Sequence, residues 1–225
     1  MSALLSDVLR PARHVLVDFD GPVCSVFAGF PAVEVAQRLR MALLTKGEKL
    51  PASCEDETDP LALLRHISIE RPDLMAEADT VLTRLEEEAV QLACPTPGGE
   101  AVLRACVASG RTVWMVSNNA SSAIQSYLNM HNLSDQVTGV FGRVPGDPSS
   151  MKPSPRLLLD AMDAAAASPT ECIFIGDAVR DVEAGDAAGV ATIGYANKPR
   201  KNVALAMAGA VAVVESMKII AEALS

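Results

Sequence analysis

The feature that most constrains this chain is an apolar run, His14-Val15-Leu16-Val17, that ends in Asp18-Phe19-Asp20-Gly21. The run is typical of a buried parallel strand, and the two carboxylates and the glycine fall where that strand gives way to a loop. Ligands of open α/β sheets bind outside the carboxyl ends of the strands, so both acids lie at the expected mouth of a site. Two acids held this close repel each other, which favours a bound hard cation that takes oxygen ligands.

Taken alone, the motif Asp-x-Asp-Gly also occurs in calcium loops and in ordinary turns. A helix–loop–helix calcium loop would continue with more oxygen ligands and a closing Glu. Here the mostly apolar segment Pro22-Val23-Cys24-Ser25-Val26-Phe27 follows, so the calcium interpretation fails. A plain turn stays open for the motif in isolation.

Two more apolar runs end in polar side chains. Arg111 to Val116 ends in Ser117-Asn118-Asn119, and Cys172 to Ile175 ends in Gly176-Asp177, with Asp181 four residues beyond. Each cluster by itself also fits a strand-end turn or a helix N-cap. Their occurrence at successive strand ends favours one shared site.

A lysine completes the set. Lys152-Pro153 follows a loop rich in Gly, Pro and Ser and opens a helical stretch, Ser154 to Ala166. Alone, Lys152 also fits a surface lysine before a helix-initiating proline. The order along the chain is therefore acid pair, hydroxyl, lysine, acid pair.

The remaining pattern alternates strands and helices, which predicts a Rossmann-like parallel sheet with helices on both faces. Further strands are expected at 136–141, 190–195 and 210–214, and core helices at 98–109, 121–130, 181–188, 202–208 and 216–224. About a hundred residues separate the first two motif strands, far more than one crossover needs. Helices at 32–44, 60–69 and 73–92 fill this gap, the last carrying Glu86 to Glu88 on an expected solvated face.

In order and context these motifs resemble the haloacid dehalogenase superfamily, in its phosphoglycolate-phosphatase-like branch with a helical cap. The resemblance covers the chain from His14 onward and implies a catalytic core of residues 1–29 and 95–225, with an α-helical cap of residues 30–94 inserted after the first strand. Position by position it implies these roles: Asp18 the nucleophile, Asp20 the acid/base, Ser117 and Asn118 the phosphate-binding pair, Lys152 the charge-neutralising lysine, and Asp177 with Asp181 the acidic metal motif.

Mg²⁺ is the cofactor that this donor set favours, held by the side chains of Asp18 and Asp177 and by the backbone carbonyl of Asp20. We expect Asp181 to lie behind these ligands and to orient Lys152 or a metal-bound water. Pro22 stands where the family usually has Thr or Val. Because proline has no N–H, backbone donors to a phosphate must come from Phe19, Asp20 or Gly21.

Composition narrows the partners of the chain. The net charge is −9 and the basic residues do not cluster, which argues against nucleic-acid binding. No apolar stretch is long enough for a membrane span. The five cysteines, an odd number, and the lack of a recognisable signal peptide predict a cytoplasmic protein. The sequence leaves the oligomeric state open.

We therefore expect a Mg²⁺-dependent phosphatase that hydrolyses a small phosphorylated metabolite through an aspartyl-phosphate intermediate. A phosphomutase of the same family is the near alternative, separable by its need for a bisphosphate activator. A dehalogenase is disfavoured because that branch keeps no acid equivalent to Asp20, and a non-catalytic binding protein stays possible on the same fold. The cap would close about hinges near Gly29 and Pro95–Gly99. Its basic residues are the candidates for leaving-group contacts: Arg65, His66, Arg71, Lys46 and Lys49.

Overall fold

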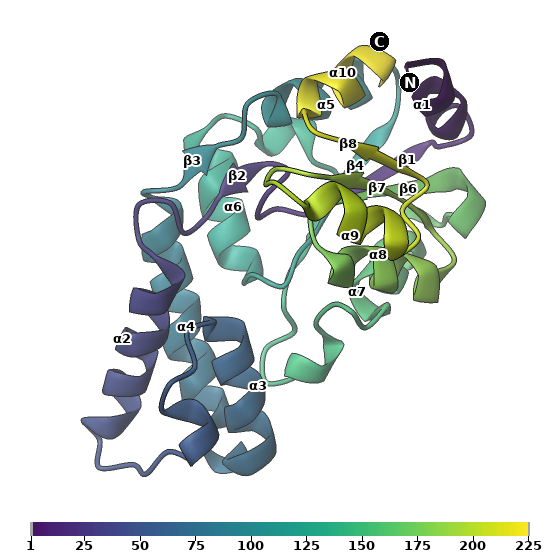
Figure 1. Ribbon diagram of the computed structural model, residues 1–225. Helices are drawn as coiled ribbons and strands as arrows, with labels where there is room; N and C mark the ends of the chain where they lie inside the picture. The colour runs from purple at the N-terminus through teal and green to yellow at the C-terminus, as the bar shows by residue number, and fades with distance from the viewer. Residues whose placement is uncertain (1, 225) are drawn as a thin grey trace.

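A six-stranded parallel sheet forms the centre of the computed structural model, which describes residues 2–224 (Figure 1). In spatial order its strands are β5 (Gly139–Phe141), β4 (Thr112–Val116), β1 (His14–Val17), β6 (Cys172–Gly176), β7 (Ala191–Tyr195) and β8 (Ala212–Val214). Because β1 lies between β4 and β6, the three motif strands are adjacent. Val17 pairs with Met115 on one side and with Ile175 on the other, so their carboxyl ends meet at one edge.

The sheet is covered on both faces, which confirms the predicted fold class. Alternate residues of β1 enter different apolar clusters: Val15 and Val17 face one, and Leu16 faces the other. The first face is covered by α1 (Ser2–Leu9), α5 (Gly99–Ala108), α6 (Ser121–Met130) and α10 (Met217–Leu224), and the second by α7 (Arg156–Ala165), α8 (Val179–Ala188) and α9 (Lys201–Met207). An apolar run buried on both sides is what a central parallel strand requires.

Three further helices stand to one side of the sheet, beyond its site edge (Figure 1). They are α2 (Ala32–Leu44), α3 (Pro60–Glu70) and α4 (Met75–Val90). The chain enters and leaves them through two short antiparallel strands, β2 (Cys24–Ser25) and β3 (Cys94–Pro95). These helices, which we call the cap helices, occupy the segment for which the sequence predicts a cap. Their movement over the site stays a proposal.

Several boundaries differ from the sequence-based predictions. The strand expected at 136–141 is shorter, since a 3₁₀ turn precedes β5, and the helix expected at 73–92 is α4 preceded by another 3₁₀ turn. Helix α1 and the pair β2–β3 have no counterpart among the predicted elements. For β2 and β3 the reason is their length, because runs of two residues carry no periodicity. The 3₁₀ turns are Ala52–Cys54, Pro72–Leu74, Ser134–Gln136, Pro148–Ser150 and Pro169–Glu171.

The prediction that Glu86 lies on a solvated face is wrong. Its side chain is fully buried, whereas Glu87 is half-buried and Glu88 is exposed. Helix α4 packs against α2 and α3 of the cap and also against α6 of the core, so a face of α4 that periodicity assigns to water is covered. A buried carboxylate requires partners, and Arg143 supplies them.

No helix within residues 2–224 combines the length and the apolar character needed to cross a membrane.

Candidate active site

Asp18 continues the line of β1 by one residue. Its backbone N–H donates to the carbonyl of Ile175 (2.9 Å). Its Oδ1 accepts the N–H of Phe19 (2.8 Å) and lies 2.9 Å from Nζ of Lys152. The residue is only 5% exposed. Burial raises the pKa of its carboxyl from 3.8 to about 7, although the positive charge of Lys152 lowers it.

Asp20 lies in the turn that follows. Its Oδ1 accepts the N–H of Val26 (2.9 Å), and burial raises the pKa of Asp20 although this hydrogen bond lowers it. Gly21 makes the turn possible with φ of +108°, where a Cβ would come within 2.5 Å of Cγ of Asp177. The glycine thus lets the first acid motif approach the last one.

Among the backbone N–H groups of residues 18–21 and 117–119, those of Asp20 and Asn118 have no acceptor within residues 2–224. The N–H groups of Phe19 and Gly21 are already used by oxygens inside the loop. Of the three donors that Pro22 leaves available, only Asp20 can therefore serve a ligand. Asp20 and Asn118 both line the cavity described below, so their N–H groups are available to a ligand that accepts hydrogen bonds.

Ser117 and Asn118 follow β4, and both are buried. The hydroxyl of Ser117 donates to Oδ1 of Asn119 (3.2 Å) and accepts the N–H of that residue (3.4 Å). The amide of Asn118 pairs with the backbone of Lys152, accepting its N–H (2.8 Å) and donating to its carbonyl (3.2 Å). The side chain of Asn118 therefore positions the lysine, while its own N–H is left for a ligand.

Lys152 is 1% exposed, and its ammonium lies at the centre of the site. Nζ lies 2.9 Å from Oδ1 of Asp18 and 2.7 Å from Oδ1 of Asp181, and it donates to the carbonyl of Val116 (3.1 Å). Burial lowers the pKa of Lys152, but the nearby carboxylates of Asp18 and Asp181 raise it by more, so the net pKa is raised. The lysine is therefore a fixed cation.

Asp177 and Asp181, the second acid pair, have different partners. Asp181 is fully buried, and its Oδ2 accepts the N–H groups of Asp177 (3.0 Å) and Ala178 (2.9 Å) at the start of α8. Oδ2 of Asp177 accepts Nδ2 of Asn197 (2.8 Å) and pairs with the ammonium of Lys201. Asp181 thus shapes the loop, while Asp177 brings a carboxylate close to those of Asp18 and Asp181.

The donor set fits a hard divalent cation. Carboxylate oxygens of Asp18, Asp177 and Asp181 all lie within 4.8 Å of one another. Both oxygens of Asp181 already have partners in Lys152 and the α8 loop, so Asp18 and Asp177 are the side chains free to bind a metal. The carbonyl of Asp20, which accepts no backbone hydrogen bond within residues 2–224, is available as a third oxygen.

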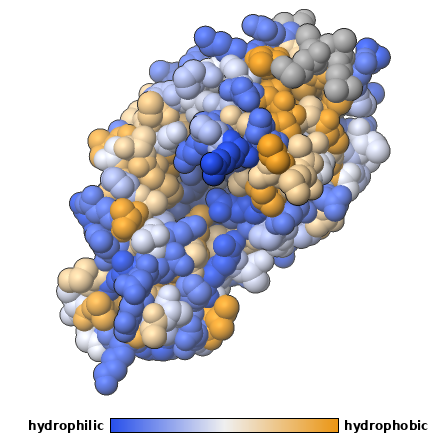
Figure 2. Space-filling view, in the orientation of Figure 1, coloured by the Kyte–Doolittle hydropathy of each residue, from blue (hydrophilic) through white to orange (hydrophobic). Residues whose placement is uncertain are grey.

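A cavity of about 340 Å³ opens onto these groups, between the sheet edge and the cap helices. Figure 2 shows the hollow, with hydrophilic residues around it. The core lines it with Asp18, Asp20, Phe27, Ser117, Asn118, Asn119, Lys152 and Arg180, and the cap helices and their loops with Ala32, Thr58, Asp59, Pro60 and Leu61. The residues predicted as nucleophile, acid/base, phosphate-binding pair and lysine all line this cavity, whereas Asp177 and Asp181 do not.

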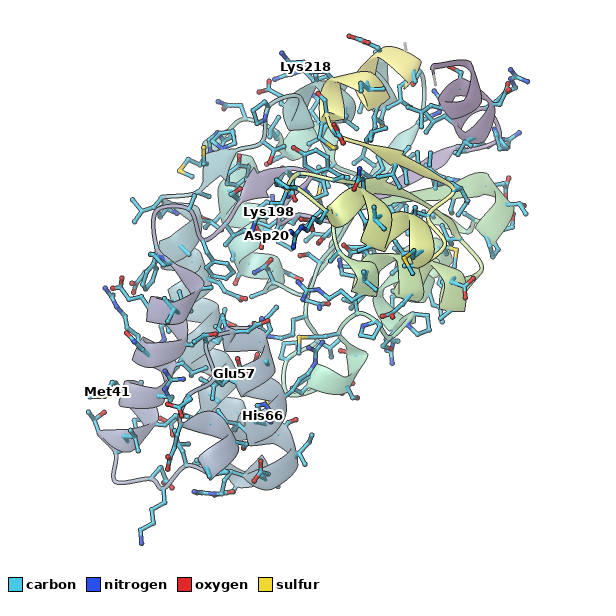
Figure 3. All side chains as sticks on the ribbon, viewed as in Figure 1. Asp20, Met41, Glu57, His66, Lys198 and Lys218 are labelled. Carbon is cyan, nitrogen blue, oxygen red and sulfur yellow. The ribbon has the colours of Figure 1, made fainter. Side chains whose placement is uncertain are left out.

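Among the basic cap residues, Arg65 contacts the site. Its Nη2 donates to the carbonyl of Lys152 (2.9 Å). His66 instead lies 3.6 Å from Glu57, and Figure 3 shows both in the cap, well away from Asp20. Two other candidates form ion pairs away from the cavity: Arg71 with Glu48 and Asp73, and Lys46 with Glu77.

Three site residues were not predicted. Arg180 lines the cavity and forms no ion pair with any residue between 2 and 224. It lies between Asp177 and Asp181 in the sequence, so its place within that motif could have predicted it as a site residue. Asn197 follows the end of β7 by two residues, where the strand-end rule would have found it. Lys201, at the start of α9, has no local signature.

Comparison with known proteins identifies the family of this chain. Residues 12–189 match the family of haloacid dehalogenase-like hydrolases. A phosphoglycolate phosphatase of Xylella fastidiosa is 32% identical over 133 residues, which are 56% of this chain and 56% of the relative. An N-acetylmuramic acid 6-phosphate phosphatase of Pseudomonas aeruginosa is 24% identical over 182 residues, 80% of each chain. The first of these matches thus spans about half the length of the relative.

Solved structures share the fold. A haloacid dehalogenase-superfamily hydrolase of Geobacter sulfurreducens superposes with a TM-score of 0.61 at 21% identity, covering 96% of this chain and 97% of the other. The chain belongs to the haloacid dehalogenase-like hydrolases, as its motifs predicted. Within that family, relatives that carry the name phosphoglycolate phosphatase match it in sequence.

Proposed function

We propose that this chain is a Mg²⁺-dependent phosphatase that hydrolyses small phosphate monoesters through an aspartyl-phosphate intermediate. The observation that carries the proposal is the meeting of the acid pair Asp18 and Asp20, a fixed lysine and two unpaired backbone N–H groups at one cavity. Phosphoryl transfer needs a positioned nucleophile and neutralisation of the phosphoryl charge. The site offers both.

In the first half-reaction Asp18 attacks phosphorus and the ester P–O bond breaks. Oδ1 of Asp18 is held by Lys152 and by the N–H of Phe19, which leaves Oδ2 as the attacking oxygen. Asp20, whose pKa is raised by burial, gives its proton to the departing alkoxide. In the second half-reaction Asp20 takes a proton from water, which attacks the acyl phosphate and frees Asp18.

The transferred phosphoryl oxygens would be bound by the N–H groups of Asp20 and Asn118, the hydroxyl of Ser117 and the ammonium of Lys152. A Mg²⁺ ion held by Asp18, Asp177 and the Asp20 carbonyl would supply the remaining positive charge and fix one phosphoryl oxygen. The clustering of Asp18 with Asp177 and Asp181 supports this role, because a cation offsets the repulsion among them.

The size of the cavity favours a small substrate over a phosphoprotein. Its cap side includes Thr58 and Leu61, and Arg180 adds a cation without a carboxylate partner within 4 Å among residues 2–224. Phosphoglycolate and N-acetylmuramic acid 6-phosphate, named for two relatives, are therefore the first substrates to assay. All five cysteines are free thiols, which is consistent with work in a reducing cytoplasm.

The test is turnover of p-nitrophenyl phosphate with and without Mg²⁺, followed by a panel of phosphorylated acids, sugars and nucleotides. Asp18→Asn should abolish turnover, since an amide cannot form the acyl phosphate, while the exposed Asp163→Asn serves as a matched control. Turnover that survives Asp18→Asn would refute the nucleophile. Activity that needs a bisphosphate and returns phosphate to a sugar would identify a phosphomutase instead.

A further inference from the structure

Arg143, in the loop after β5, connects a cap helix to the core. Its side chain is 1% exposed. Nε donates to Oδ1 of Asp79 (2.8 Å), and Nη1 donates to both oxygens of Glu86 (3.0 and 3.1 Å), both acids being on α4. Nη1 also donates to the backbone carbonyl of Asn118 (3.1 Å). The guanidinium thus binds the cap helix and the phosphate-binding loop at once.

Glu86 makes the second connection between the same two elements. Its Oε1 accepts Nδ2 of Asn119 (3.1 Å), and its Oε2 accepts the backbone N–H of Ala120 (3.0 Å). Together, Arg143 and Glu86 therefore hold three consecutive residues, 118–120. Fixing the Asn118 carbonyl also fixes the peptide plane that turns the Asn119 N–H toward the Ser117 hydroxyl.

The connection continues to the lysine. The amide of Asn118 pairs with the backbone N–H and carbonyl of Lys152, whose ammonium bridges Asp18 and Asp181. Arg65 of α3 donates to the same Lys152 carbonyl. Two cap helices are thus hydrogen-bonded to the two loops that would receive the phosphoryl group.

A requirement for stability alone does not explain this arrangement. Burying a guanidinium and two carboxylates costs desolvation free energy that their attraction only roughly repays, and apolar residues of similar volume would serve as well or better. What charged groups add is direction, since each hydrogen bond specifies where one loop atom must lie. The atoms specified here are those of the phosphate-binding loop.

We propose that Arg143 and Glu86 are positioning residues that hold residues 117–120 in the geometry that binds phosphate, so that docking of α4 and phosphate binding are thermodynamically coupled. The proposal rests on the proposed function, because it assumes that this loop receives a phosphoryl group. Coupling is reciprocal: if a docked α4 favours phosphate, bound phosphate must favour a docked α4.

The full-length chain with Mg²⁺ provides the first test, using the conservative variants Arg143→Lys and Glu86→Gln. Calorimetric titration with inorganic phosphate, and inhibition by orthovanadate, should show binding weakened by at least tenfold, about 1.4 kcal/mol. Gln91→Ala is the matched control: Gln91 follows α4 and donates to Ser126 of α6 (3.1 Å), so its loss loosens a cap–core contact that does not touch the loop. That variant should bind phosphate as the wild type does.

The wild-type chain gives a second test that does not depend on the folding of any variant. Saturating inorganic phosphate should slow amide hydrogen exchange in both 117–121 and α4. Exchange slowed in the loop alone would overturn the coupling, as would variants that lose thermal stability but bind phosphate within about twofold of wild type. Equal weakening by Gln91→Ala would also overturn it. A wild-type chain that binds no phosphate would refute the proposed function itself, and this inference with it.

Discussion

Neutralising Asp18 should make the metal-free protein more stable, and the gain should depend on pH. The carboxyl is buried beside Asp177 and Asp181, and burial followed by these two charges outweighs the attraction of Lys152. The pKa of Asp18 therefore rises from 3.8 to about 7. Between about pH 4 and about pH 7 the folded protein holds a proton that the unfolded chain has lost, so stability falls as pH rises through this range.

The size of the effect follows from the shift. Each pKa unit corresponds to about 1.4 kcal/mol, so the ionised carboxylate lowers the free energy of unfolding by roughly 4 kcal/mol at pH 8. At pH 5 the folded-state carboxyl is still protonated, and the penalty is only about 1.6 kcal/mol. Asp18→Asn removes the ionisation at both pH values. Its stabilising effect should therefore be larger at pH 8 than at pH 5 by about 2 to 3 kcal/mol.

The assay is urea unfolding of wild type and Asp18→Asn in the presence of a chelator at the two pH values. Comparing the two gains cancels any packing difference between the amide and the acid. Asp73→Asn is the control, because its surface carboxylate has its pKa lowered chiefly by hydrogen bonds from Arg71 and should show no such gain. An equal effect of Asp18→Asn at both pH values, or a larger one at pH 5, would refute the assignment of Asp18 as a destabilised buried acid.

The other predictions concern single side chains around the cavity. Asp20→Asn should still form a phosphorylated protein from p-nitrophenyl phosphate, detectable by mass spectrometry, because p-nitrophenolate needs no acid; equal loss on activated and unactivated esters would contradict this role. Lys152→Met should lower the free energy of unfolding by about 3–5 kcal/mol in urea, since it leaves two buried carboxylates facing each other; a neutral result would contradict the ion-pair geometry. Arg65→Ala should change the ranking of natural substrates more than it changes turnover of the aryl phosphate, whereas His66→Ala should change neither; uniform loss with Arg65→Ala would place that residue in the scaffold.

Those parts of the fold that rest on long apolar runs could be predicted from the sequence. The strands that end at Asp18, Ser117 and Asp177 are buried on both faces, and such strands read as continuous apolar segments. Because parallel strands share a carboxyl edge, their position also predicted that these residues would come together. Elements shorter than one period, such as β2 and β3, carry no such signal.

Contacts made across the fold could not be predicted in this way. Glu86 has the sequence context of a solvated helix face, and Arg143 lies in a polar loop among Gly and Pro residues. They come together and are buried where α4 packs against the core. The same holds for Lys201, whose partner Asp177 is 24 residues away along the chain. A periodic pattern predicts which side of a helix or strand is apolar, but it does not predict which polar residue forms an ion pair with a buried charge.

A buried ion pair would suit the cap movement that we propose. If α4 left the core, Arg143 and Glu86 would both return to water, so the lost attraction would be largely offset by regained hydration. An apolar contact of the same area would have no such compensation, because exposing it costs free energy in proportion to its surface. Removing one partner is different, since the other charge then stays buried without a partner whenever the cap docks. The pair can therefore specify the docked geometry strongly while contributing little to the free energy of docking.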